Sequence, residues 1–248
     1  MELKNRRNLS PSIPFRVKRP ATDKIIFLSC EGAVTEEEYF KMITEMFDEV
    51  KSKIQFISVM EEAINTLPKF RTQEQIVDIS KSKPLQLVEK IEKFKEVNND
   101  KFDLDKHTED EFWIIADVDD HTNADNIDDW NKTIALCELS NYGYAISNPM
   151  FEIWLLIHHV DVNEDDYKYA VTTEQPYNKS SHFRDRLRKD ATASLRDKKH
   201  INREDYNRQK VLDAIERAKV LHDKTEKWPS HLGTTVYKLL EKINNLCN

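Results

Sequence analysis

The chain has 248 residues, 39% of them hydrophobic, and a formal net charge of −7. This length is sufficient for one large domain with a substantial core, and the acidic net charge argues against a general polyanion binder. Three widely separated cysteines exclude a disulfide framework and a cysteine zinc site, and three glycines exclude a glycine-rich phosphate loop.

The sequence also predicts where the protein resides. No apolar run approaches the length of a membrane span, and the basic N-terminus has no apolar signal segment behind it. Few and scattered cysteines suit a reducing compartment. We therefore expect a cytoplasmic protein that makes no contact with a membrane.

Residues 1–22 alternate prolines with basic residues without sustained periodicity, so we interpret them as an arm. Short apolar runs then predict four strands, over residues 24–30, 53–60, 111–118 and 143–148. Helical patterns separate these runs, from Thr35 to about Val50, from Pro84 through Phe94, and from Ile127 to Ser140. Thr35 and Glu38 have the spacing of a capping box, and Glu36 and Glu37 suit a helix N-terminus.

Strands that alternate with helices favour a parallel sheet. We therefore expect an α/β core over residues 23–160, a Rossmann-like four-stranded parallel sheet between helices. Pro149 is expected to open a helix capped by Asn148. Later helices are expected over about 180–195, 203–222 and 234–246, so residues 161–248 are interpreted as a helical extension packed on the core.

Acidic side chains follow the predicted strands at the points where they end. Glu31 ends the first strand, Asp117 and Asp119 end the third, and Glu152 lies one turn into the helix after the fourth. Parallel α/β sheets bind ligands at the carboxyl ends of their strands. The two-residue period of an extended chain places Asp117 and Asp119 on one side.

Such a cluster needs a counter-charge, because two carboxylates about 4 Å apart repel by roughly 4 kcal/mol at an effective dielectric near 20. A hard divalent cation, Mg²⁺ or Mn²⁺, suits oxygen ligands and serves phosphodiester cleavage. Taken alone, each acid also fits a turn, a cap or a helix dipole partner. Asp120 and His121 are secondary candidates for the site, whereas His158 fits a hydrogen-bonded core histidine.

The charge is distributed unevenly. Residues 100–129 hold twelve acids against two lysines, whereas residues 179–210 hold eleven lysines and arginines against five acids. The basic segment fits either solvated helix faces or a nucleic-acid contact surface. Its candidate contact residues are Arg184, Arg186, Arg188, Lys189, Lys198 and Lys199.

Three blocks resemble a known family: SCEGAVTEEEYF (29–40), ADVDDH (116–121) and SNPMFEIWLLIH (147–158), with a weaker fourth block, TTVYKLLEKI (234–243). A Glu-Gly pair after the first strand and an Asp-x-Asp after the third resemble the Toprim domain. Together the blocks resemble the RloB family of Toprim-like proteins, which includes the AbiLii component of abortive-infection systems.

The resemblance implies a Toprim core, a role in bacterial defence against phage and an ATPase partner. It implies that Glu31, Asp117 and Asp119 are the Toprim acids, whereas Glu152 matches only the RloB block. Related Toprim proteins, including the overcoming-lysogenization-defect nucleases, are metal-dependent nucleases. Nuclease activity in the RloB branch is an extension by analogy.

The leading hypothesis is therefore a Mg²⁺- or Mn²⁺-dependent nuclease that acts on RNA, with tRNA as one candidate, or on DNA. Asp117 and Asp119 would hold the ion, and Glu31 would complete the site or act as general acid or base. Glu152 would add a ligand or orient a water. The alternative is a non-cutting metal- or nucleotide-binding sensor or effector that works through the ATPase. A structural defence subunit is a third reading, and a homodimer is compatible with the sequence.

Overall fold

The computed structural model describes residues 24–32, 34–47, 49, 53–59, 83–118, 124–171, 179–190, 193, 195 and 199–245. The predicted arm, residues 1–22, lies outside these residues.

The centre of the molecule is a mixed five-stranded sheet in the order β2-β1-β3-β4-β5. The strands are β1 (Lys24–Cys30), β2 (Ile54–Ser58), β3 (Glu111–Asp117), β4 (Gly143–Asn148) and β5 (Gly233–Thr234). The four predicted strands are parallel, as expected. The expectation of a four-stranded, all-parallel sheet is wrong, because β5 from the C-terminal part pairs antiparallel with β4. Two residues give no periodic signal, and only the neighbouring edge of β4 makes them a strand.

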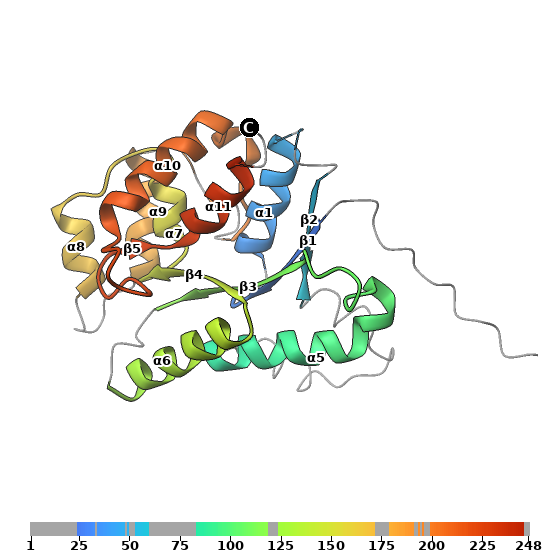
Figure 1. Cartoon of the computed structure of the whole chain (residues 1–248). Helices are drawn as coiled ribbons and strands as arrows, with labels where there is room; N and C mark the ends of the chain where they lie inside the picture. The colour runs from blue at the N-terminus through green and yellow to red at the C-terminus, as the bar shows by residue number, and fades with distance from the viewer. Residues whose placement is uncertain are drawn as a thin grey trace, which may run out of the picture.

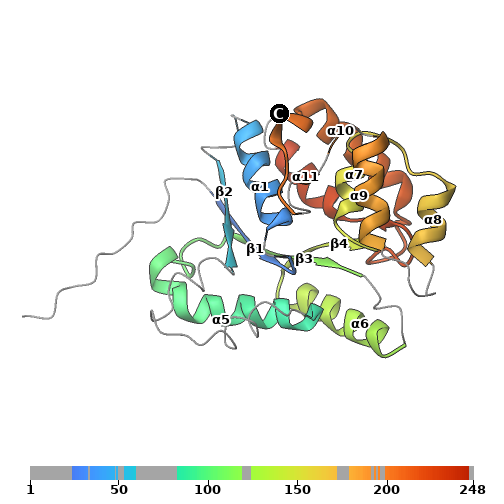
Figure 2. The ribbon, with the colours of Figure 1, turned by 180° about the vertical axis from the view of Figure 1, so that it is seen from behind.

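Helices cover both faces of the sheet (Figure 1). One face carries α5 (Pro84–Phe102) and α6 (Ala124–Leu139), and the other carries α1 (Thr35–Met46), α7 (Glu152–Leu156), α9 (Lys179–Asp190), α10 (Arg208–Leu221) and α11 (Val236–Asn245). The short helix α8 (Glu164–Val171) lies at the β5 end of this second layer, and a 3-10 turn, Arg203–Asp205, precedes α10. Figure 2 shows the same three layers from behind. None of the described helices has the length and apolar character needed to cross a membrane.

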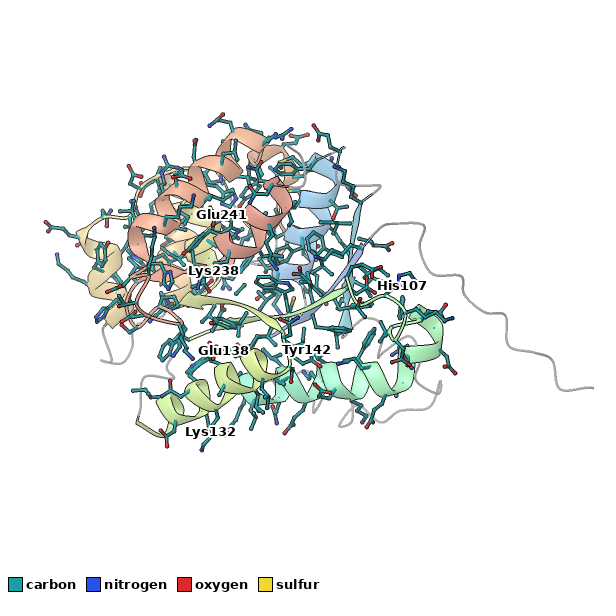
Figure 3. The ribbon with its side chains drawn as sticks, viewed as in Figure 1. His107, Lys132, Glu138, Tyr142, Lys238 and Glu241 are labelled. Atoms are coloured by element: carbon teal, nitrogen blue, oxygen red, sulfur yellow. The ribbon has the colours of Figure 1, made fainter. Side chains whose placement is uncertain are left out.

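Alternation along the strands divides the core in two. On β1, Ile25 and Phe27 join the cluster under α5 and α6, whereas Ile26, Leu28 and Cys30 join the cluster under α1, α7, α10 and α11. Continuous apolar runs are needed because both faces are covered. Figure 3 shows the two layers through their labelled side chains, with Lys132 and Glu138 on α6 and Lys238 and Glu241 on α11 across the sheet.

The connections of β1 and β3 diverge. From β1 the chain crosses through α1 to β2 on one side, whereas from β3 it crosses through α6 to β4 on the other side. Neighbouring parallel strands whose connections lead in opposite directions form a topological switch point, and ligands in α/β sheets bind in the crevice there. Glu31 follows β1 and Asp117 ends β3, so both lie at this point.

The start of α7 differs from the sequence prediction. Pro149 does not open the helix, which begins at Glu152 with Phe151 as its N-cap residue. Asn148 is the last residue of β4, and its side-chain amide donates to the carbonyl oxygen of Pro229 at 3.0 Å instead of capping a helix. Glu152 is therefore the first helical residue rather than one turn into a helix.

The predicted capping box at the start of α1 is also absent. Val34 is the N-cap residue, without a side-chain cap. Thr35 donates its hydroxyl to the carbonyl oxygen of Lys199 at 2.8 Å, and Glu38 binds the His200 ring and the backbone N–H of Ile201. Long-range partners have replaced the local bonds, so these side chains attach the basic segment to α1.

His158 is a core histidine, as predicted. It is 1% exposed, and its Nδ1–H donates to the carbonyl oxygen of Trp154 at 2.7 Å. The other ring nitrogen therefore accepts from the Tyr39 hydroxyl at 3.0 Å. Burial lowers the pKa of His158 to about 3, so the ring is neutral and ties α7 to α1.

Candidate functional site

Glu31 and Asp117 are brought together at the carboxyl edge of the sheet. The backbone N–H of Glu31 donates to the carbonyl oxygen of Ile115 at 2.9 Å, which continues the β1–β3 pairing past the end of β1. The Glu31 carboxylate then accepts a hydrogen bond from the backbone N–H of Asp117 at 3.1 Å. The carboxylate at the end of β1 is thus bound to the last residue of the neighbouring strand β3.

Asp117 faces the helical layer that contains α1 and α7. It is two residues beyond Ile115, whose side chain packs in the cluster under those helices, and successive side chains of a strand alternate between faces. Cys30 lies on the same face at the end of β1. Burial raises the pKa of the Cys30 thiol, and the charges of Glu36, Glu37 and Asp117 raise it further. The charges of three carboxyl groups therefore act on the end of β1.

Glu36 belongs to this candidate site, although the sequence did not predict it there. It lies in the first turn of α1 but is only 5% exposed. Its side chain packs on Gly32, where an added Cβ would lie 2.3 Å from Glu36 Oε2. Its position was the available signal, because residue 36 continues the buried stripe of Tyr39, Phe40 and Ile43 at helical spacing.

The environment of Glu36 raises the pKa of its carboxyl toward neutral pH. Burial raises its pKa to about 7, the charges of Glu152 and Glu37 contribute in the same direction, and hydrogen bonds from the backbone N–H groups of Glu36 and Gly32 oppose the shift. The raised pKa favours the protonated form of Glu36, which limits the negative charge that this group of carboxyls must accommodate.

Glu152 opens α7 with a side chain that is only 9% exposed. Arg184 from α9 donates its Nε–H to one of the Glu152 carboxylate oxygens at 2.8 Å, and its Nη2 lies 2.7 Å from the same oxygen in an ion pair. The sequence predicted Glu152 as a site residue and Arg184 as a nucleic-acid contact, whereas the structure pairs the two. Arg184 thus serves as the counter-ion of a nearly buried carboxylate.

Two further side chains, Ser58 and Lys90, interact with the carboxyl groups of the candidate site. Ser58, the last residue of β2, donates its hydroxyl to Glu37. Lys90 on α5 is partly buried; desolvation lowers its pKa, and the charge of Glu31 acts in the opposite direction. Glu31 is therefore within electrostatic range of a cation on the α5 side, while Glu152 has its cation on the α7 side.

The remaining basic candidates have different environments. Arg186 binds both oxygens of the fully buried Asp166, at 3.2 and 2.9 Å, and also pairs with Asp190 at 2.6 Å. These bonds hold α9 against α8. Three other candidates, Arg188, Lys189 and Lys199, are exposed, and the first two lie near Asp185.

Four predicted residues, Asp119, Asp120, His121 and Lys198, lie outside the described residues. Within the described part of the chain, no group of three His, Cys, Asp or Glu side chains has the arrangement of a metal site. The carboxylate oxygens of Glu31 and Asp117 nevertheless have the chemistry that a hard divalent cation requires.

A family model described as RloB-like protein matches residues 26–243. The chain belongs to the RloB-like family. This match extends from β1 into α11, so it covers every described site residue of this RloB-like chain. A search of curated proteins and a search of solved structures each found no match.

Proposed function

We propose that this RloB-like chain is a metal-dependent nuclease of the Toprim type, which acts on RNA or DNA as the effector of a bacterial abortive-infection system with an ATPase partner. The observation that carries the proposal is the hydrogen bond between the Asp117 backbone and the Glu31 carboxylate at the switch point of the sheet. Family membership adds support, because the matched region contains both acids.

The donor groups fit Mg²⁺ or Mn²⁺. Asp117 and Asp119 would hold the ion, with Glu31 as a third oxygen donor or as general acid or base. A bound divalent cation would stabilise the charge that develops on a phosphodiester and activate a water. The structure supports oxygen ligation, since the described groups around Glu31 and Asp117 include several carboxylates and the nearby Cys30 thiol stays protonated.

Three further glutamates near the carboxyl edge of the sheet are held by contacts with their neighbours. Arg184 fixes the orientation of Glu152 through a hydrogen bond and an ion pair, so Glu152 would act by orienting a water or through a neighbouring carboxyl. Burial and the charge of Glu152 raise the pKa of Glu36 to about 7, so its protonated form is favoured below neutral pH. Ser58 orients Glu37. Together these contacts hold a set of acids that would otherwise repel one another.

The test is cleavage by the purified chain. Wild type, Asp117→Asn and the matched control Asp128→Asn, an exposed aspartate of α6, are incubated with labelled tRNA, other RNA and plasmid DNA in Mg²⁺, Mn²⁺ or EDTA, with and without the ATPase partner. The proposal expects metal-dependent cleavage by wild type and the control but not by Asp117→Asn. Cleavage that persists in EDTA or in Asp117→Asn would refute it.

The Glu152–Arg184 pair favours a second candidate, because it commits a predicted ligand and a predicted nucleic-acid contact to each other. In this reading the chain is a non-cutting metal- or nucleotide-binding subunit that signals through the ATPase. Binding of Mn²⁺ or nucleotide without cleavage in any of the assays above would select this function.

A further inference from the structure

The start of α5 is attached to the end of β1. The Ser29 hydroxyl donates to the carbonyl oxygen of Leu87 at 3.0 Å, in a buried contact. Ser29 lies on the α5 face, since it continues the alternation of Ile25 and Phe27. The first turns of α5 are therefore held beside the strand end that carries Glu31.

Lys90 follows Leu87 by three residues, so the two side chains lie on neighbouring positions of the helix surface. Long side chains on a helix lean toward its N-terminus, which for α5 is the end held beside Glu31. Lys90 is partly buried, whereas Lys93, one turn further along the helix, is exposed. The charge of Glu31 acts on the Lys90 ammonium group, which agrees with this placement.

In the part of the chain that the structure describes, a cationic side chain borders the carboxyl edge of the sheet, where Glu31 and Asp117 lie, on each face. On the α7 face, Arg184 is bound to Glu152 by a hydrogen bond and an ion pair. On the α5 face, the Ser29–Leu87 hydrogen bond holds the helical turn of Lys90 beside the end of β1, and the charge of Glu31 acts on Lys90. A phosphodiester that approaches Glu31 and Asp117 meets negative charge, so a cation at this point would lower the electrostatic cost of binding.

We propose that Lys90 is a substrate-binding residue that contacts a non-bridging phosphate oxygen of a nucleic acid held at the carboxyl edge of the sheet. The inference rests on the proposed function, because it places the nucleic acid at the same edge. Lys90 would add a nucleic-acid contact from α5, which lies outside the basic segment (residues 179–210) predicted from the sequence. Lysine suits this role because its ammonium group offers three donors on a flexible stem.

The experiment measures binding separately from cleavage. Wild type, Lys90→Gln, Lys90→Arg and the matched control Lys93→Gln are titrated, as full-length chains, against labelled single-stranded RNA and DNA of the same sequence. Fluorescence anisotropy is recorded over a series of KCl concentrations, in EDTA and in Ca²⁺, and gels verify that the probe stays intact. Cleavage in Mg²⁺ is measured on the same preparations.

Lys90→Gln is expected to weaken binding about tenfold and to reduce the slope of log K against log salt by about 1. Lys93→Gln should match wild type, and Lys90→Arg should retain most of the binding. Equal affinities and slopes for Lys90→Gln and Lys93→Gln would overturn the inference and leave the nuclease proposal standing. Lys90-dependent binding without cleavage would count against the nuclease alone, and absence of binding by wild type would overturn both.

Discussion

The carboxylate of Glu31 accepts a hydrogen bond from the backbone N–H of Asp117, 3.1 Å away, although 86 positions separate the two residues. The bond joins the tips of β1 and β3, the two strands between which the chain reverses its direction of crossover. A side chain that binds the backbone of its neighbour is held in one orientation, and such fixed groups are what a catalytic or metal site requires.

Glu31→Gln should separate structure from chemistry. Glutamine keeps an oxygen that accepts from the Asp117 N–H, so the free energy of unfolding should change by less than about 1 kcal/mol. If Glu31 is a ligand or a general acid or base, cleavage should fall on the order of 10²-fold to 10⁴-fold. Urea unfolding and single-turnover cleavage check the two expectations, and wild-type cleavage by this variant would remove Glu31 from the chemistry.

Arg184→Met should destabilise the protein by about 1–3 kcal/mol, because it leaves the nearly buried Glu152 carboxylate without its counter-ion. The double variant Arg184→Met/Glu152→Gln should lose less than the two single variants combined. Arg188→Met is the control, since its partner Asp185 is exposed and such pairs contribute roughly 0–1 kcal/mol. Additive losses in the double-mutant cycle, measured by urea unfolding, would contradict the assigned pair.

Glu36→Gln should change how stability depends on pH. The folded-state pKa of about 7 exceeds the ordinary value of 4.5, so the folded protein keeps a proton that the unfolded chain releases between these pH values. Stability contributed by Glu36 is therefore full below pH 4.5 and is lost as the pH rises through 7.

Relative to wild type, Glu36→Gln should thus gain stability above pH 7, by roughly 3 kcal/mol at most, and show no gain at pH 4. Glu89→Gln, at an exposed position of α5, is the control. Chemical unfolding at a series of pH values gives the comparison. A constant difference between Glu36→Gln and wild type across the range would show that this carboxyl does not titrate as described.

Gly32→Ala should displace the Glu36 carboxylate, because the added Cβ would lie 2.3 Å from its Oε2 atom. Overpacking of this kind costs about 1–3 kcal/mol, and cleavage should fall with it if the Glu36 position matters. Gly233→Ala provides a milder comparison, since the nearest atom to its added Cβ is the Leu221 carbonyl oxygen at 3.3 Å. Equal thermal midpoints for Gly32→Ala and wild type would show that the Glu36 side chain can move aside freely.

Local patterns predicted the parallel part of the sheet and its helices. The apolar runs of β1 and β3 identified buried strands, and their exits identified Glu31 and Asp117 as neighbours before any coordinates, because parallel strands end at one edge. Strand β5 was missed, since residues 233 and 234 become a strand only where β4 offers backbone partners. The start of α7 was misplaced because the Asn148 amide binds Pro229 instead of capping the helix.

Three consecutive glutamates show most clearly what the sequence determined and what it did not. The sequence predicted that Glu36, Glu37 and Glu38 would stand at the start of a helix, and they do. Only the tertiary structure separated them: Glu36 is buried against Gly32, Glu37 binds Ser58, and Glu38 binds His200. Each residue of a helix is rotated by about 100° from the preceding residue, so the three side chains point in different directions. The charge state of each carboxyl then depends on which distant segment of the chain packs against it.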